Sequence, residues 1–312
     1  MEKSEQKTVR AKRPHLSAKF HENLYQVICT GVCLIVALLC LYPLLYTLVV
    51  SFASPSDILY QFVIPIPTRV SLYAYIQVFT VSSFLGRAIA VSVFRTVVGT
   101  VLSVFVCAML SYAIARKNIP GKKYFMYLMI FLILFNGGLI PTYLVIRGVG
   151  LLDNIWVYVF PNIINAWNVI IVKQSMEGIP AEVEESAMLD GVNDLQNFLW
   201  VVLPMSKPVI AAISIFTLVF QWNSWYDAML YVSPASSKLW PLQYYATISL
   251  NNLNQINNAD LGNLEGIMGI QDVDNMSIKM ALTVITTLPI LCVYPFFQKY
   301  FTKGVYLGAV KG

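Results

Sequence analysis

Charged residues are scarce in this chain of 312 residues. Asp, Glu, Lys and Arg make up 12% of it, whereas a soluble protein carries about 25%. Hydrophobic residues make up 57%. Because so little charge is available, most of the surface must face something other than water, and the composition predicts an integral membrane protein. The net charge of +5 is too small to indicate nucleic acid as a partner.

The residues that usually carry catalysis or metal binding are also few. The chain has two histidines, His15 and His21, near its beginning, and five cysteines that lie in apolar runs without a CxxC pair. No GxxxxGK[ST] phosphate loop occurs. We therefore expect neither an enzyme nor a metal site, and no cofactor bound by this chain. A membrane protein without a nucleotide loop would have to obtain its energy from another polypeptide.

Six segments are apolar and long enough to cross a bilayer as helices, which needs about 20 residues. The first is too long for a signal-peptide core and is interpreted as a retained span. The fold class predicted is thus an all-α integral membrane protein with six transmembrane helices. The segments are Val27–Phe52, Ala88–Ala115, Tyr124–Ile146, Ile155–Val172, Pro208–Val232 and Ile278–Phe301.

The distribution of Lys and Arg predicts the orientation. Fifteen of the 21 basic residues fall on the side that holds both termini, and six fall on the other, so the positive-inside rule places both termini in the cytoplasm. The basic N-terminal tail could instead bind lipid or nucleic acid. The predicted organisation is a cytoplasmic tail (1–26), a first transmembrane helix (27–52), an external loop (53–87), a five-helix core (88–301) with a cytoplasmic loop (173–207) and an external loop (233–279), and a cytoplasmic tail (302–312).

The cytoplasmic loop has a distinct pattern. Pro180 suits a helix start, and Glu182 and Glu185 follow in the first turns, where the helix dipole favours negative charge. Gly191 supplies the conformational freedom to end that helix. A second apolar segment then leads to Pro204. The pattern predicts two short helices that offer a rigid surface to a soluble partner, although an amphipathic hairpin that only anchors the loop in the interface would look the same.

These residues resemble the signature loop of importer permeases of the ATP-binding-cassette (ABC) class. That signature is a Glu-Ala-Ala triplet, a glycine six residues after the Glu, and a Leu-Pro further on. Here Glu185, Gly191 and Leu203-Pro204 match it, and only Ser186 departs, as another small residue. Further stretches resemble the sugar-importer branch, in particular the second permease of maltose-type systems: Phe135–Tyr143, Trp222–Tyr226 and Gln298–Gly312. Val91-Ser92 departs from an expected Asn-Ser.

The resemblance implies a type I ABC importer permease in a bacterial plasma membrane. It implies a second homologous permease, an ATPase dimer that binds ATP and Mg²⁺, an extracellular solute-binding lipoprotein that the last external loop would reach, and a sugar substrate. ATPase coupling is expected at Glu182, Glu185, Ser186, Ala187, Asp190, Gly191, Leu203 and Pro204. A further ATPase contact is expected in the C-terminal tail, at Lys303, Gly304, Gly308, Lys311 and Gly312.

Polar and aromatic residues inside spans are candidates for the sugar path, because sugars present apolar faces edged with hydroxyls. If the fifth span is one helix, Trp222, Trp225 and Tyr226 share a face, and Asn223 and Asp227 share the adjoining one. An aromatic belt at the interface, or hydrogen bonds between helices, would explain the same residues. The candidates are Asn162, Asn165, Gln221, Trp222, Asn223, Trp225 and Tyr226.

Two other functions remain open at this point. A permease of the same class could carry a solute other than a sugar, and an ATP-independent carrier or channel could have a similar composition. A carrier would need paired charges or broken helices within the spans, and the sequence shows no such pair. Arg95 is an intramembrane charge, which is a functional candidate by default, but near the outer interface it could simply extend toward water.

Overall fold

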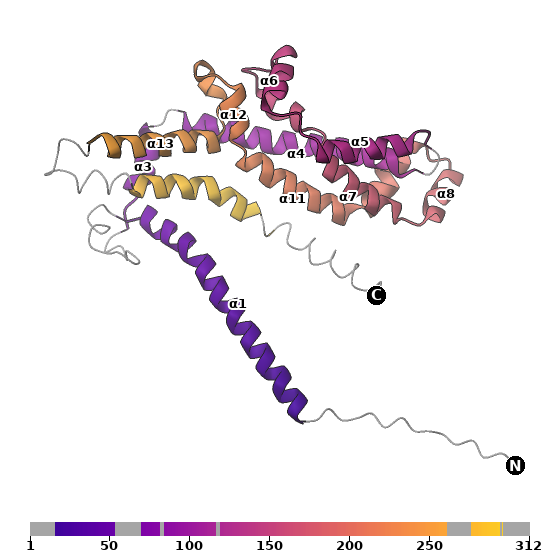
Figure 1. The fold of residues 1–312 in the computed structure, drawn as a ribbon, viewed down its shortest axis with the longest axis horizontal. Helices are drawn as coiled ribbons and strands as arrows, with labels where there is room; N and C mark the ends of the chain where they lie inside the picture. Colours follow the sequence, from indigo (N-terminus) through magenta and orange to yellow (C-terminus); the bar gives the residue numbers. More distant parts are fainter. Residues whose placement is uncertain are drawn as a thin grey trace.

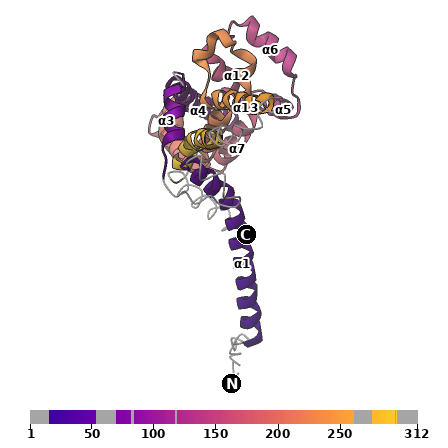
Figure 2. The ribbon, with the colours of Figure 1, turned by 90° about the vertical axis from the view of Figure 1, so that its left-hand side faces the viewer.

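A computed structural model describes residues 16–53, 70–81, 84–116, 119–260, 276–293 and 295. Every regular element within these ranges is a helix, as the sequence predicts. The helices form an elongated bundle from which the first helix, α1, leads away (Figure 1), and the view at right angles shows the same separation (Figure 2).

Helix α1 spans Leu16–Ser51 and continues through Pro43. It begins eleven residues before the predicted first span, so the helix also includes residues that the sequence assigned to the N-terminal tail. Once a helix exists, each further residue extends it at little cost, and no Pro or Gly follows Pro14 in this part of the tail. None of the residues in the most apolar stretch of α1 is buried.

Helix α4, Leu85–Ala115, is the centre of the bundle and packs mainly against α7 (Ala166–Glu177) and α11 (Lys207–Asn223). Its buried face is rich in small residues, which let neighbouring helices approach closely. One core cluster joins these three helices to the loop 173–207, with members Val104, Ala108, Val172, Met176, Phe198, Val202 and Ile213.

Several predicted spans are bent. Helices α5 (Lys122–Leu134) and α6 (Leu139–Gly148) meet at 116°, and Gly138 with φ 88° stands at their junction. The 3₁₀ turns η1 (Ile155–Tyr158) and η2 (Phe160–Asn162) meet α7 at 50°.

By length and composition, the described ranges contain three helices that can cross a membrane, or up to six if each bent pair is one span. The three are Asn23–Ser51, Leu85–Ala115 and Met276–Val293.

Both predicted external loops contain helices. The segment 53–87 includes α3 (Tyr73–Val81), and the segment 233–279 includes η4 (Pro234–Leu239) and the 19-residue helix α13 (Leu242–Asp260). The fifth span, predicted to run to Val232, ends instead at Asn223 and is followed by the short helix α12, Tyr226–Tyr231. Helices α3 and α13 lie at the end of the bundle opposite the loop 173–207 (Figure 1).

Candidate functional site

The first helix of the loop 173–207 is α8, Ala181–Leu189, and it follows Pro180 as predicted. Glu182 and Glu184 lie in its first turn. Gly191 ends it with φ 83°, a conformation that glycine adopts without the strain of a side chain. The N–H of Gly191 donates to the Met188 carbonyl (3.0 Å), and the N–H of Val192 donates to the Ala187 carbonyl (3.2 Å). This is a Schellman ending, and it fixes how the chain leaves α8.

The second helix of the loop comprises α9 (Asp194–Gln196), the π-helical turn η3 (Asn197–Val202) and α10 (Leu203–Met205). Asn193 and Gln196 form a reciprocal capping box at its start. Pro204 lacks the N–H that an α-helix would use, and the wider turn just before it is one way to accommodate that loss. The predicted pair of short helices is confirmed.

One face of α8 is exposed on the surface of the subunit. Glu182, Glu185, Ser186 and Asp190 are exposed, whereas Ala187 is half-buried. Met188 and Leu189, at the end of the same helix, are 40% and 89% exposed. The helix therefore presents carboxylates beside apolar side chains, a combination that suits a protein partner.

A cluster that we call the Arg116 latch attaches this loop to the end of α4. It consists of Arg116, Tyr112, Glu184, Asp194 and Asn197. The guanidinium of Arg116 lies 2.8 Å from Asp194 and 3.8 Å from Glu184, and it also donates to the Tyr112 hydroxyl. The fully buried Asn197 donates to Tyr112 (3.2 Å) and Glu184 (3.3 Å). No local sequence signal predicts the latch, because Arg116 and Asp194 are 78 positions apart.

A pocket of about 300 Å³ lies between α4, α7 and α11, and we call it the amide pocket. It brings together three predicted path residues, Asn162, Asn165 and Gln221. Asn165 caps α7 by accepting from the Asn168 N–H (3.1 Å), and Asn168 donates to Thr217 (3.2 Å). The full lining is Ser103, Asn162, Ile164, Asn165, Trp167, Asn168, Phe216, Thr217, Phe220 and Gln221.

A second, more open hollow of about 300 Å³ adjoins the first through Phe220, and we call it the outer pocket. It holds three more predicted residues, Asn223, Trp225 and Tyr226. The side-chain amide oxygen of Asn223 accepts a hydrogen bond from the Gln243 side chain on α13 (3.0 Å). The rings of Trp225 and Tyr226 meet edge to face at 5.9 Å. The two pockets together thus offer amides and aromatic faces, the groups that suit a sugar.

Trp222 lies elsewhere. Its side chain is only 5% exposed and packs in a core cluster with α3, α13 and the last helix, and its indole N–H donates to the Thr286 carbonyl (2.9 Å). The prediction that it shares a face with Trp225 and Tyr226 is wrong. The reason is that α11 ends at Asn223 and Ser224 is extended, so residues on either side of the break do not follow one helical repeat.

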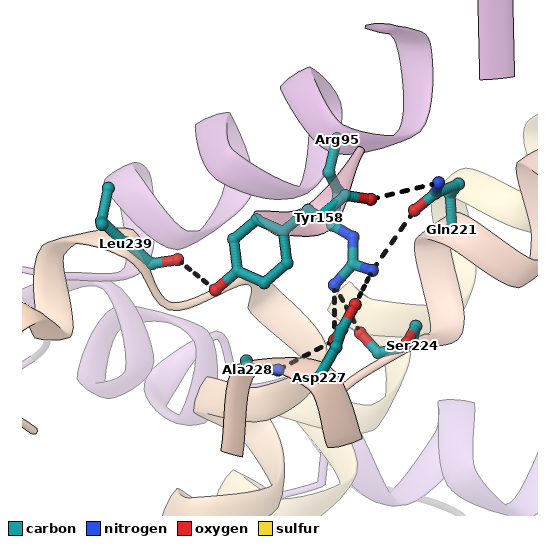
Figure 3. A network of polar contacts seen from close by, with 7 residues as sticks. All are labelled: Arg95, Tyr158, Gln221, Ser224, Asp227, Ala228 and Leu239. Carbon is teal, nitrogen blue, oxygen red and sulfur yellow. Dashed lines mark hydrogen bonds and ion pairs between the residues drawn. The ribbon is translucent and has the colours of Figure 1, made fainter. Parts of the chain in front are cut away.

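A buried ionic network, the Arg95 cluster, lies at the same break (Figure 3). Arg95 is 0% exposed, and its two terminal nitrogens hold the Asp227 carboxylate at 3.1 and 2.5 Å. The guanidinium also donates to the Ser224 carbonyl (2.9 Å) and to the Gln221 side chain (3.3 Å). It stacks over the Tyr158 ring at 4.5 Å.

Two predictions from the sequence are corrected by this cluster. Arg95 does not extend toward water, and the transmembrane part does contain a paired charge. The partners are more than 120 residues apart in the sequence, and the break after Asn223 brings them together, so spacing within one span could not show the pair. The signal that could have revealed the pair is that the predicted spans hold one Arg and one Asp, and that their only other charged residues are Lys279 and Lys299.

The predicted tail contacts Lys303, Gly304, Gly308, Lys311 and Gly312 lie outside the described residues. Within the described part of the chain, no group of three His, Cys, Asp or Glu residues could hold a metal ion.

Comparison with known proteins gives close and nearly full-length similarity. The polygalacturonan/rhamnogalacturonan transport system permease protein YtcP of Bacillus subtilis is 39% identical over 290 residues, which cover 93% of this chain and 99% of YtcP. Protein LplC of the same organism is 39% identical over 272 residues, covering 86% of this chain and 89% of LplC.

A crystal structure of a bacterial ABC transporter involved in the import of the acidic polysaccharide alginate contains a chain with TM-score 0.79 and 30% identity, covering 90% of this chain and 98% of that one. No protein-family model matches the chain. The similarity to YtcP and to the alginate importer, on an all-helical fold within the described residues, shows that this chain belongs to the permease subunits of carbohydrate ABC importers.

Proposed function

We propose that this chain forms one half of the translocation path of an ATP-driven, binding-protein-dependent importer of oligosaccharides. The observation that carries the proposal is the connection of two features through one helix. Helix α4 contributes Ser103 to the amide pocket, and its end holds the cytoplasmic loop through the Arg116 latch. A movement imposed on the loop therefore reaches the pocket through a continuous helix.

The proposed topology has six spans with both termini in the cytoplasm. Basic residues from three segments gather near the loop, which supports its cytoplasmic side: Arg116 binds Asp194, while Lys122 and Lys173 both lie 2.8 Å from Glu177. Single cysteines at Ser186 and Gln255, in a cysteine-free background, test the arrangement. A membrane-impermeant thiol reagent added outside cells should label position 255 and spare position 186; the opposite result would reverse the topology.

In this proposal α8 is the docking helix for the ATPase, which binds ATP and Mg²⁺. Glu185 faces outward on α8 and would meet a basic residue of the ATPase, and the tail 302–312 would lie along the same partner. We expect Glu185→Lys to leave the subunit inserted but to lower solute-dependent ATP hydrolysis and uptake at least tenfold. Ser175→Ala, on α7 rather than on α8, is the control. Normal uptake by an assembled Glu185→Lys transporter would contradict the docking role.

The second permease would cover apolar surface that is open in the isolated subunit. The apolar stretch of α1 has no buried residue, and α1 stands away from the other helices (Figure 2). Both pockets are open hollows, which fits a path completed by another subunit. We therefore propose a heterodimer of two related permeases above two ATPase subunits, with a solute-binding lipoprotein outside.

For the solute we propose oligosaccharides that contain uronic acids. YtcP is named for polygalacturonan and rhamnogalacturonan, and the solved importer takes up the acidic polysaccharide alginate, whereas another relative, AraQ of Halalkalibacterium halodurans, is named for arabinooligosaccharides and is 27% identical. Amide groups can bind both hydroxyl and carboxylate oxygens, so the pockets fit either group of sugars.

The test uses the assembled transporter with its binding protein in proteoliposomes. Trigalacturonate should be imported and should stimulate ATP hydrolysis. Arabinotriose and maltotriose are tested as neutral sugars, and inorganic phosphate is tested as a solute that is not a sugar. Import of arabinotriose alone would replace the uronate proposal with a neutral sugar. Import without ATP would identify a carrier and reject the proposal entirely.

A further inference from the structure

The Arg95 guanidinium bridges the two sides of a helix break. On one side it donates a hydrogen bond to the carbonyl of Ser224. Ser224 follows the last residue of α11, so no later turn of that helix supplies a donor for this carbonyl. On the other side it holds Asp227 in the first turn of α12, where the same carboxylate accepts the Ala228 N–H at 2.9 Å. One buried cation therefore fixes the end of α11 and the start of α12 relative to α4.

The cluster also fixes the side chain of Gln221. Because an arginine only donates hydrogen bonds, the oxygen of the Gln221 amide must point to Arg95, and its nitrogen then donates to the Tyr158 carbonyl at 3.3 Å. On the α4 side, Gly99 leaves the room that this amide occupies, since a Cβ at position 99 would lie 2.7 Å from the amide nitrogen. Gln221 thus enters the lining of the amide pocket in one orientation.

A buried ion pair is an expensive way to hold helices together, because apolar side chains of similar size often stabilise a fold as well or better. What the pair adds is a defined geometry at the break. Asn223, Trp225 and Tyr226 lie at this break and line the outer pocket, while Gln221 lines the amide pocket. The Arg95 cluster therefore contributes Gln221 to the lining of the amide pocket and Ser224 to the lining of the outer pocket.

We propose that Arg95, paired with Asp227, is the positioning residue of the solute path: it holds the α11–α12 break and Gln221 in the geometry that binds the sugar. This inference rests on the proposed function, because it assumes that the two pockets form the path. It predicts that disturbing the pair changes apparent solute affinity more than turnover.

The experiment uses the assembled transporter and the double variant Arg95→Gln/Asp227→Asn, which removes both charges and leaves neither one buried alone. Arg87→Gln is the matched control, because Arg87 is an exposed arginine on the same helix. Arg95→Lys keeps the charge but not the two-pronged contact, so it should give an intermediate effect.

The first measurement is the labelling rate of a cysteine at Asn223 in a cysteine-free background, which reports the break without any solute. The second is trigalacturonate uptake, separated into KM and maximal rate. In the double variant we expect the labelling rate to change at least threefold and KM to rise about tenfold, with the maximal rate within about twofold of wild type. Arg87→Gln should match wild type in both.

Unchanged labelling, or changed labelling with unchanged KM, in an assembled double variant would overturn the inference. If the double variant does not assemble, Arg95→Lys carries the same two measurements. Failure of the proposed function looks different: wild type would not import trigalacturonate, or Asn162→Ala and Asn165→Ala would leave its uptake intact. The labelling measurement would then still decide whether Arg95 holds the break.

Discussion

Two arginines of this permease, Arg95 and Arg116, each bind helices that are distant in the sequence, but they do so in opposite surroundings. Arg95 is fully buried within α4, and Arg116 lies just beyond the end of the same helix with 24% of its side chain exposed. Arg95 binds the carboxylate of Asp227 with both terminal nitrogens, whereas Arg116 forms one ion pair with Glu184 and another with the largely exposed Asp194.

The difference matters because water changes what an ion pair contributes. A solvent-exposed pair contributes about 0–1 kcal/mol and is screened by salt, whereas breaking a buried pair costs about 3–5 kcal/mol because one charge is left without a partner. Arg95 therefore suits a geometry that must stay fixed, and Arg116 suits a contact that can rearrange when a partner moves the loop. The 21 residues of helix between them correspond to about 30 Å.

The largest effect should come from breaking the buried pair on one side only. Arg95→Leu leaves the Asp227 carboxylate buried without its cation, and we expect a loss of about 3–5 kcal/mol. The amount of folded subunit in detergent extracts, followed by size-exclusion chromatography with fluorescence detection, should fall severely. Arg87→Leu on the exposed face of α4 is the control. Equal yields from the two variants would show that the Arg95 pair does not stabilise the subunit.

A smaller loss should follow from crowding the same cluster without touching its charges. Gly99→Val places a side chain where the Gln221 amide lies, and overpacking of this kind costs about 1–3 kcal/mol. We expect a lower melting temperature of the purified subunit and weaker solute affinity. Gly86→Val is the control, because a Cβ at position 86 meets no atom within 4 Å. If both variants melt alike, Gly99 is not needed for the fit of Gln221.

The two arginines also mark what the sequence could and could not predict. The helices of the loop that Arg116 binds were largely predicted, because Pro180, the early glutamates and Gly191 are local signals that act within a few residues. The Arg95 cluster was not, because the break after Asn223 depends on tertiary packing and its partners come from separate helices. The apolar pattern likewise predicted unbroken helical spans. In the structure, α5 and α6 meet at 116° around Gly138, a bend that the pattern does not reveal.

At the other end of α4, Gly191→Ala tests the loop that the latch holds. A non-glycine residue with φ near 83° costs about 1–2 kcal/mol, but the strain is local to the end of α8. We expect nearly normal folding and a several-fold lower ratio of solute imported to ATP hydrolysed. Gly31→Ala, in a straight part of α1 with no atom near the added Cβ, should leave that ratio unchanged. A normal ratio in the Gly191 variant would show that this turn does not transmit movement.

The smallest effect on stability should come from Arg116→Gln, and it completes the comparison with Arg95. The latch is partly exposed, so its loss should lower stability by only about 0–1 kcal/mol and leave assembly intact. Because its pairs are screened by ions, wild-type coupling between ATP hydrolysis and import should weaken as salt rises from 0.1 to about 0.5 M, over which the Debye length shrinks from about 10 Å to roughly half of that. The Arg116→Gln transporter should start at the weaker level and respond little to salt. The Arg95→Lys transporter keeps the latch, so it should respond to salt as wild type does. A salt response that is the same in wild type and Arg116→Gln would mean that coupling does not pass through the latch.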